Sequence, residues 1–260
     1  MYSFGENNHH KKLTQTKFIY INSANANSGT NSNPSIYFPP SLFTNNSNSQ
    51  KTLKISLYSC TINREWYNVI NGINDILQYY NGTISQYITI PEGSYSVYEL
   101  MTLLNTLLVG MTLSYDLVTN KYTFTPVDLT SWINPTTCGT FLGLQNGITY
   151  TGIFTSEFPV NMLYESDIYL NTNIGTTGYS LDNVNGLEIQ SSTIIEKVPI
   201  TVPPFGNIIF NANEKHSSLT IPMLNNLTSL NLWWSTSRLR KLENLIQPWS
   251  VTLRIDIYEN

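Results

Sequence analysis

The sequence predicts a mainly β protein, a sandwich or jelly roll of many short strands into which a small α+β module is inserted. Short runs of alternating apolar and polar residues lie near both ends of the chain, and Gly, Pro or Asn punctuates them. One amphipathic helix lies between these two blocks of strands. The length of 260 residues suits one large β domain or two smaller ones.

The first block of strands spans about residues 17–62. It begins with Phe-Ile-Tyr-Ile at 18–21, residue types that favour strands. Residues 22–35 are rich in Asn and Ser and predict a loop. The run LKISLY at 53–58 then alternates aliphatic residues with polar or aromatic ones, which is the pattern of a strand with one buried face.

The predicted helix lies in the segment ITIPEGSYSVYELMTLLNTLL at 88–108. Ser96 and Glu99 have the spacing of a capping box, in which each side chain satisfies a free backbone N–H at the helix start. Leucines then recur at intervals of three and four residues, so one stripe of the helix must cover an apolar surface. The runs MTLSYDL and KYTFTP follow and predict a hairpin that turns at Thr119 and Asn120.

The last block of strands spans about residues 165–258. Its strongest run is 251–258, where Val, Leu and Ile alternate with polar residues or Tyr. Neither block can close a two-sheet core without the other, so the segment between them is expected to be an insertion in one sandwich. The other runs that predict strands lie at 167–172, 192–201, 207–213, 217–223 and 229–234.

The expected organisation therefore has three parts. A flexible N-terminal arm spans 1–16, because these residues contain no apolar period and cannot bury enough surface to offset their ordering entropy. The sandwich domain spans 17–73 and 149–260, and the inserted α+β module spans 74–148. The arm carries a small basic cluster that consists of His9, His10, Lys11 and Lys12.

The composition excludes several classes of protein. Charged residues make up 12% of the chain, against roughly 25% in an average globular domain. A net charge of −4 argues against a protein whose whole surface binds nucleic acid. No apolar run of 18 residues occurs, so no transmembrane segment is predicted. The polar N-terminus lacks a signal core, so synthesis in the cytosol is expected, and Cys60 and Cys138 are expected to be free thiols.

The histidines and carboxylates do not form a recognisable catalytic or metal-binding pattern. A zinc site needs three or four ligands at defined spacing, and a catalytic triad needs a base near a nucleophile. His216 stands alone in a polar stretch, and no Gly-rich phosphate loop occurs. Glu157 and Glu165 could form a glycosidase pair, but a β protein of this size supplies such pairs by chance. We therefore predict no catalytic residue, no cofactor, no metal and no enzymatic activity.

Two neighbouring features near the end of the chain are candidates for a contact between subunits. Trp233 and Trp234 are adjacent, so they must point to opposite faces of a strand, and core and interface are equally plausible for them. Arg238, Arg240 and Lys241 place three positive charges within four residues. A solvated loop and a contact to a neighbouring subunit remain alternatives for this basic run.

An ordered set of motifs covers most of the chain. It resembles the minor capsid and penton-type jelly-roll proteins of virophages, polinton-like viruses and related large DNA viruses of protists. The segment STSRLRKLENLIQPW departs from that pattern, because a local acidic or Gly-containing turn is expected before the final strand. The motifs are KFIYINSANANSGTNSNPSIYF, LKISLYSCTINREWYNV, ITIPEGSYSVYELMTLLN, LSYDLVTNKYTF, FLGL, IYLNTNI, STIIEKVPI, SLNLWW and WSVTLRIDIY.

The resemblance implies a single jelly roll and a structural capsid protein, most specifically the homopentameric vertex (penton) protein of an icosahedral shell. A non-vertex minor capsid or cement protein and a carbohydrate-binding β sandwich are the alternatives. The implied partners are other copies of the chain, the major capsid protein and, through the insertion, a host receptor or a fibre. The N-terminal arm would run beneath the shell toward genome, an internal membrane or neighbouring capsid protein. Capsid protein is favoured over genome, because the two lysines of the arm can neutralise few phosphates. The implied location is the virion.

Overall fold

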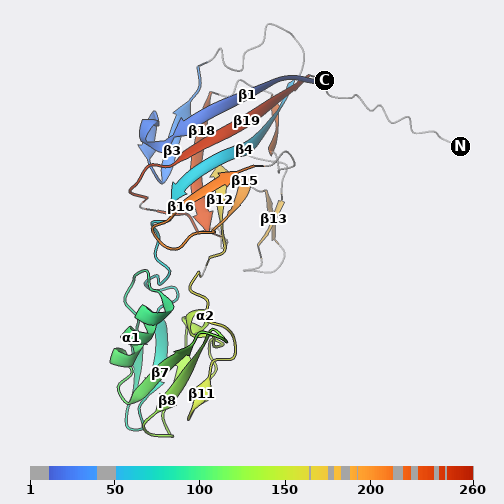
Figure 1. The fold of residues 1–260 in the computed structure, drawn as a ribbon. Coiled ribbons are helices and arrows are strands. Elements are labelled where there is room, and N and C mark those ends of the chain that lie inside the picture. Colours follow the sequence, from blue (N-terminus) through green and yellow to red (C-terminus); the bar gives the residue numbers. More distant parts are fainter. Residues whose placement is uncertain are drawn as a thin grey trace, which may run out of the picture. The chain divides into compact units, whose positions relative to one another are not determined.

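The computed structural model describes residues 12–39, 51–163, 165–174, 179–182, 188–191, 193–212, 219–223, 228–236, 240–243 and 245–259. The chain divides into two compact units (Figure 1). The jelly-roll unit consists of residues 1–65 and 166–260, and the inserted unit consists of residues 66–165.

The jelly-roll unit contains two five-stranded antiparallel sheets. Sheet one has the order β1 (Lys12–Asn22), β19 (Ser250–Glu259), β4 (Lys51–Asn63) and β16 (Asn207–Asn211), and β17 (Leu219–Met223) also pairs with β4. Sheet two has the order β15 (Ile194–Pro199), β12 (Asp167–Thr172), β18 (Ser229–Thr236), β3 (Asn33–Tyr37) and β2 (Ser28–Thr30). The 3-10 helix η1 (Ser23–Asn25) follows β1, and β13 (Tyr179–Asp182) and β14 (Glu188–Ser191) form a separate hairpin.

Eight of these strands pair as one long hairpin that has been rolled up, and this pairing defines a jelly roll. In chain order they are β1, β3, β4, β12, β15, β16, β18 and β19. The first pairs with the last, the second with the seventh, the third with the sixth and the fourth with the fifth, always antiparallel. The predicted jelly-roll sandwich is confirmed, and the inserted unit lies between its third and fourth strands.

The core of the jelly-roll unit follows from the alternation in its strands. Leu53, Ile55 and Leu57 on β4 are fully buried, and two of them face Leu253 and Ile255 on β19 across the sheet. Strands β4 and β19 therefore each present one row of aliphatic side chains to the core.

The inserted unit contains two small sheets and two helices. One sheet has the order β10 (Tyr150–Thr151), β9 (Trp132–Pro135), β5 (Ile76–Tyr80) and β6 (Ser85–Thr89). The other has the order β11 (Phe154–Thr155), β8 (Lys121–Pro126) and β7 (Met111–Asp116). The helices are α1 (Val97–Leu107) and the short α2 (Gly139–Leu142).

Helix α1 forms where the sequence predicts it. Ser96 and Glu99 make the complete capping box, and Leu100, Leu104 and Leu108 are fully buried in the core of the inserted unit. The helix also closes the outer edge of β7. The Asn105 Oδ1 atom accepts a hydrogen bond from the Leu113 backbone N–H (2.6 Å), and the Asn105 Nδ2 atom donates one to the Leu113 carbonyl (3.1 Å). One side chain thus takes the place of a neighbouring strand at this residue.

The inserted unit extends beyond the predicted 74–148 on both sides. On the N-terminal side, Val69 forms a β-bridge with Gly93, and Asn68 is hydrogen-bonded to the backbone of Tyr95. On the C-terminal side, β10 and β11 complete the two small sheets. These contacts are non-local or involve strands of two residues, so they leave no periodic pattern in the sequence.

Two predictions for the N-terminal third of the chain were wrong in part. The Asn/Ser-rich segment 22–35 contains η1, β2 and the first residues of β3, because β3 is held by backbone pairing with β18. Strand β1 begins at Lys12 rather than at 17, so Lys12 does not belong to a free arm. The Thr14 hydroxyl donates to the Ile257 carbonyl (3.0 Å) within this polar stretch. The rest of the basic cluster, His9 to Lys11, lies outside the described residues.

Candidate assembly surfaces

The described part of the basic run pairs with strand β18. Thr236 N–H donates to the Arg240 carbonyl, Leu242 N–H donates to the Trp234 carbonyl, both at 2.8 Å, and Lys241 forms a β-bridge with Ser235. Local antiparallel pairing is therefore present within the segment that departs from the family pattern. Arg240 and Lys241 are half-buried in this paired segment, whereas Arg238 lies outside the described residues. We refer to residues 240–242 and their partners on β18 as the basic hairpin.

The two adjacent tryptophans have different environments. Trp233 is half-buried, whereas Trp234 is fully buried and its ring meets the ring of Trp249 edge to face, with 5.8 Å between the centroids. The Trp249 Nε1–H donates to the Asn31 carbonyl (2.6 Å). Trp234 is consequently a core residue, and its candidacy for a subunit contact is wrong. Trp233 keeps that candidacy because it points to the opposite face of β18.

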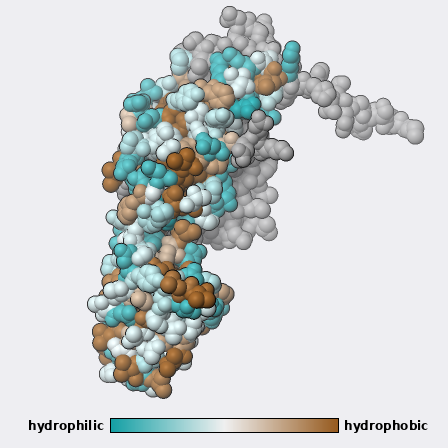
Figure 2. Space-filling view, viewed as in Figure 1, coloured by the Kyte–Doolittle hydropathy of each residue, from teal (hydrophilic) through white to brown (hydrophobic). Residues whose placement is uncertain are grey.

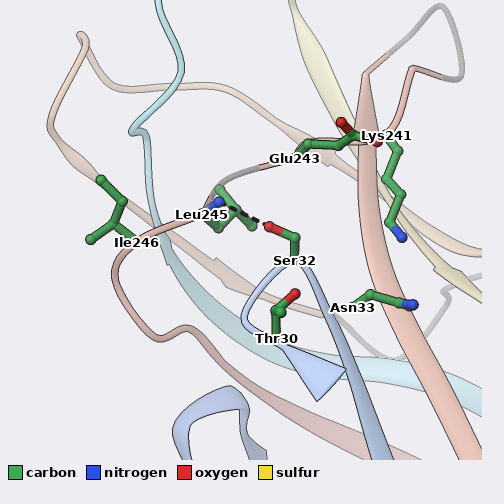
Figure 3. A pocket seen from close by; sticks show the side chains of 7 residues that line it. All are labelled: Thr30, Ser32, Asn33, Lys241, Glu243, Leu245 and Ile246. Atoms are coloured by element: carbon green, nitrogen blue, oxygen red, sulfur yellow. Dashed lines mark hydrogen bonds between the residues drawn. The ribbon is translucent and has the colours of Figure 1, made fainter.

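An open polar hollow lies beside the basic hairpin (Figure 3). It has a volume of about 510 Å³. Figure 3 shows Lys241 and Asn33 on one side of the hollow and Ile246 on the other, and the Ser32 hydroxyl oxygen accepts a hydrogen bond from Leu245 N–H (2.9 Å). The lining of the hollow offers an ammonium, a carboxylate, an amide and hydroxyl groups. None of its lining residues forms a nucleophile–base pair, so the hollow is better suited to bind a polar segment of a protein chain than to catalyse a reaction. It is lined by Thr30, Ser32, Asn33, Lys241, Glu243, Leu245 and Ile246.

The outer face of sheet one carries exposed aromatic side chains that sequence reasoning missed. The rings of Phe18 on β1 and Tyr58 on β4 meet edge to face, with 5.0 Å between their centroids, and Tyr20 is 81% exposed beside them. We call these three residues the aromatic face. Arg254 lies beside Phe18 on β19, and it forms an ion pair of 3.1 Å with Asp256, two residues farther along the same strand. The sequence does indicate this face, because Phe18 and Tyr20 alternate with Ile19 and Ile21. On a strand the two aromatic side chains must therefore lie on the opposite face from the two isoleucines.

Few side chains among the described residues have an arrangement typical of a metal-binding or catalytic site. No group of three or more His, Cys, Asp or Glu among them is arranged to hold a metal ion. Cys60 and Cys138 are free and buried, and burial raises the pKa of each thiol to about 12. Glu157 accepts hydrogen bonds from Tyr150 and Gln145, and Glu165 is buried. His216 lies outside the described residues.

Within the described ranges, every helix falls short of the length and apolar character that a membrane crossing requires.

Comparisons with known proteins show likeness in structure and none in sequence. No protein-family model matches the chain, and no curated protein matches it. The crystal structure of the mavirus penton protein matches with a TM-score of 0.56 and 10% identity, over 94% of this chain and 100% of that one. A chain in the cryo-EM structure of the Sputnik virophage matches with a TM-score of 0.53 and 12% identity, over 94% of this chain and 98% of that one. The chain therefore shares the fold of the mavirus penton protein over nearly its whole length.

Proposed function

We propose that this chain is a structural capsid protein, and specifically the pentameric vertex protein of an icosahedral virion. The observation that carries the proposal is the extent of the fold likeness. The match to the mavirus penton protein covers all of that protein and 94% of this chain, so both units take part in it. Such a protein acts by assembly rather than by turnover.

A ring of identical subunits needs two different faces that fit each other, because a cyclic assembly is built from heterologous contacts. The jelly-roll unit offers two such faces. The aromatic face lies on the outside of sheet one, and the basic hairpin extends from β18 in sheet two. Guanidinium and ammonium groups are attracted to the faces of aromatic rings, by about 0.5–1 kcal/mol where exposed and more where desolvated. The aromatic face of one subunit would thus meet the basic hairpin of the next.

The low charge density of the chain favours assembly. Only 12% of its residues are charged, so a subunit face can be buried with little loss of ion hydration. The other proposed partners are the major capsid protein, which the segment before β1 would contact, and a host receptor or a fibre, which the inserted unit would contact. Synthesis would take place in the host cytoplasm and the final location would be the virion.

Light scattering coupled to size-exclusion chromatography, followed by electron microscopy, tests the proposal. We expect a ring of five subunits. A stable monomer that binds glycans would favour a carbohydrate-binding module instead, and incorporation into shells away from the vertices would favour a minor capsid or cement protein.

The proposed contact has its own test. Replacing Arg238, Arg240 and Lys241 together by Ser, or Tyr20 by Ser, should leave the melting temperature of the monomer unchanged and weaken the ring. If the two surfaces touch, the combined variant should lose less than the sum of the two separate losses. Additive losses would place the two surfaces in separate contacts.

A further inference from the structure

The inserted unit carries a cluster of exposed aliphatic side chains on four loops. The exposed fractions of these side chains lie between 55% and 85%. Isolated exposed aliphatic residues are ordinary, whereas a group of five on neighbouring loops is not. We name this group the apolar tip, and it consists of Ile84, Val109, Val127, Leu129 and Ile153.

Contacts between the loops show that the apolar tip is one surface. Val127 N–H donates to the Gly110 carbonyl (2.8 Å), which joins the loop after β8 to the loop after α1. A Cβ atom on Gly82 would lie 2.3 Å from the Asp128 Oδ2 atom, so the β5–β6 loop touches the same place. Gly152 N–H donates to the Ser131 carbonyl (3.3 Å) and brings the β10–β11 turn beside them. Figure 2 shows apolar residues gathered at the lower end of this unit.

The loops of the apolar tip are held in place from within the unit. The Tyr79 hydroxyl donates to the Val109 carbonyl (2.6 Å), and the rings of Tyr80 and Trp132 stack with 5.7 Å between their centroids. The Asn81 Oδ1 atom accepts hydrogen bonds from the backbone N–H groups of Thr83 and Ile84, both at 3.0 Å. A surface that is ordered before binding loses little conformational entropy when it binds.

One charge lies in the middle of the apolar tip. Asp128 separates Val127 from Leu129, and its carboxylate accepts hydrogen bonds from the Thr130 backbone N–H and hydroxyl, both at 2.8 Å. These two hydrogen bonds hold the pKa of Asp128 below its usual value, so the carboxylate stays ionised. The rest of the unit is also acidic. Residues 66–165 contain seven Asp or Glu and one Lys, a net charge of −6, whereas the remaining residues contain ten Asp or Glu and twelve Lys or Arg, a net charge of +2.

We propose that the apolar tip docks into an apolar recess on a basic protein partner, where a cationic side chain faces Asp128. The charge pattern decides among the three surfaces that could cover an apolar patch. A lipid surface would have to accept the ionised Asp128 against its apolar region, where an unpaired charge is unfavourable. A second inserted unit would bring two charges of −6 together. A basic protein partner complements both the aliphatic side chains and the carboxylate.

The experiment selects peptides from a random library displayed on phage, with the full-length chain as bait. The test variant is Val127→Ser with Leu129→Ser. The matched control is Leu117→Ser with Val118→Ser, because these two aliphatic residues are equally exposed but lie in the turn at the opposite end of the β7–β8 hairpin. Circular dichroism melting confirms that both variants are folded, and the test uses only folded variants.

Selected peptides should combine aliphatic or aromatic residues with Lys or Arg. The affinity of the test variant for these peptides should be lower than that of the wild type by about tenfold or more, and the affinity of the control should be unchanged. Asp128→Asn should lower the affinity by about threefold to tenfold. Peptides that bind the test variant and the wild type equally, or that are acidic, would overturn the proposal. The proposal would also be overturned if the wild-type chain co-sedimented with phosphatidylcholine vesicles, or associated with itself, and the test variant did not. The proposal does not depend on the vertex position, because a chain that forms no ring can still carry this docking surface.

Discussion

The two units of the molecule are built from contacts of different range along the chain. In the jelly-roll unit the first strand pairs with the last, and the Thr16 hydroxyl donates to Asp256, 240 residues away. In the inserted unit, β5 and β6 are joined by residues 81–84, and β7 and β8 by residues 117–120. Local pairing costs less loop-closure entropy than distant pairing. We therefore predict that the inserted unit folds alone, whereas the jelly-roll unit requires both ends of the chain.

Removing the inserted unit is the strongest way to test this comparison. Deletion of 66–165, with Glu65 joined to Ser166 through a short Gly/Ser linker, should leave a jelly roll that unfolds cooperatively, because β4 and β12, which flank the deletion, keep all their pairing with other strands of the jelly-roll unit. The separate fragment 66–165 should also unfold cooperatively. Thermal melting followed by circular dichroism measures both. If the deletion variant lost its cooperative transition, the two units would depend on each other for folding.

Core truncations should affect one unit at a time. Trp234→Ala removes a fully buried ring from the jelly-roll unit and should cost it about 3–5 kcal/mol. Leu104→Ala removes a fully buried side chain from the inserted unit and should cost that unit about 2–5 kcal/mol. Differential scanning calorimetry should show two transitions, each lowered by only one of these variants. A shift of both transitions by either variant would contradict the independence of the units.

The closure of β7 by α1 predicts a smaller effect within the inserted unit. Asn105→Ala removes both hydrogen bonds to Leu113 and should cost about 1–3 kcal/mol, even though Ala favours helices more than Asn does. Thr106→Ala is the matched control, because it changes the helix at the next position without touching β7. Urea unfolding of the fragment 66–165 measures both variants. Equal stabilities of the two variants would mean that the Asn105 contact contributes nothing.

The smallest predicted effect is a loss of stability at high pH, which both units should show because each contains one buried thiol. Burial raises the pKa of Cys60 and Cys138 to about 12, against 9.0 for an exposed thiol. The stabilisation is complete below pH 9 and is lost as the pH rises from 9 toward 12, because the unfolded chain releases the thiol protons first. Each thiol should cost its unit about 1.4 kcal/mol at pH 10. Urea unfolding at pH 8 and pH 10 measures the total loss. Cys138→Ala should reduce it in the inserted unit alone, and the part that remains there comes from tyrosines such as Tyr122, whose pKa burial also raises.

Helix α1 and strands β4 and β19 could be predicted from the sequence because each depends on residues that are close together in the chain. The capping box at Ser96 and Glu99 and the leucine stripe gave α1, and the alternation at 53–58 and 251–258 gave β4 and β19. The ends of the inserted unit could not be predicted, because residues such as Asn68 are held by hydrogen bonds to distant backbone. Polar strands were missed for the same reason, since β3 depends on its pairing with β18.

The candidate surfaces were harder to predict than the fold. Trp233 and Trp234 look alike in the sequence, and only the register of β18 shows which one faces the core. The basic run was visible, but the hollow beside it needs Thr30 and Asn33, about 210 residues earlier in the chain. The apolar tip was missed because its five residues lie singly on four loops, and no window of the sequence contains them all.

The Asn105 contact has a consequence for crowding. An open strand edge is a template on which any other strand can add, and the risk grows with local concentration. Five copies held in the proposed ring would keep their inserted units at a permanently high local concentration. Because the Leu113 backbone is already satisfied by a side chain of its own unit, this edge of β7 cannot recruit a neighbour's strand there. A single asparagine would thus help a shell to hold many small sheets close together without fusing them.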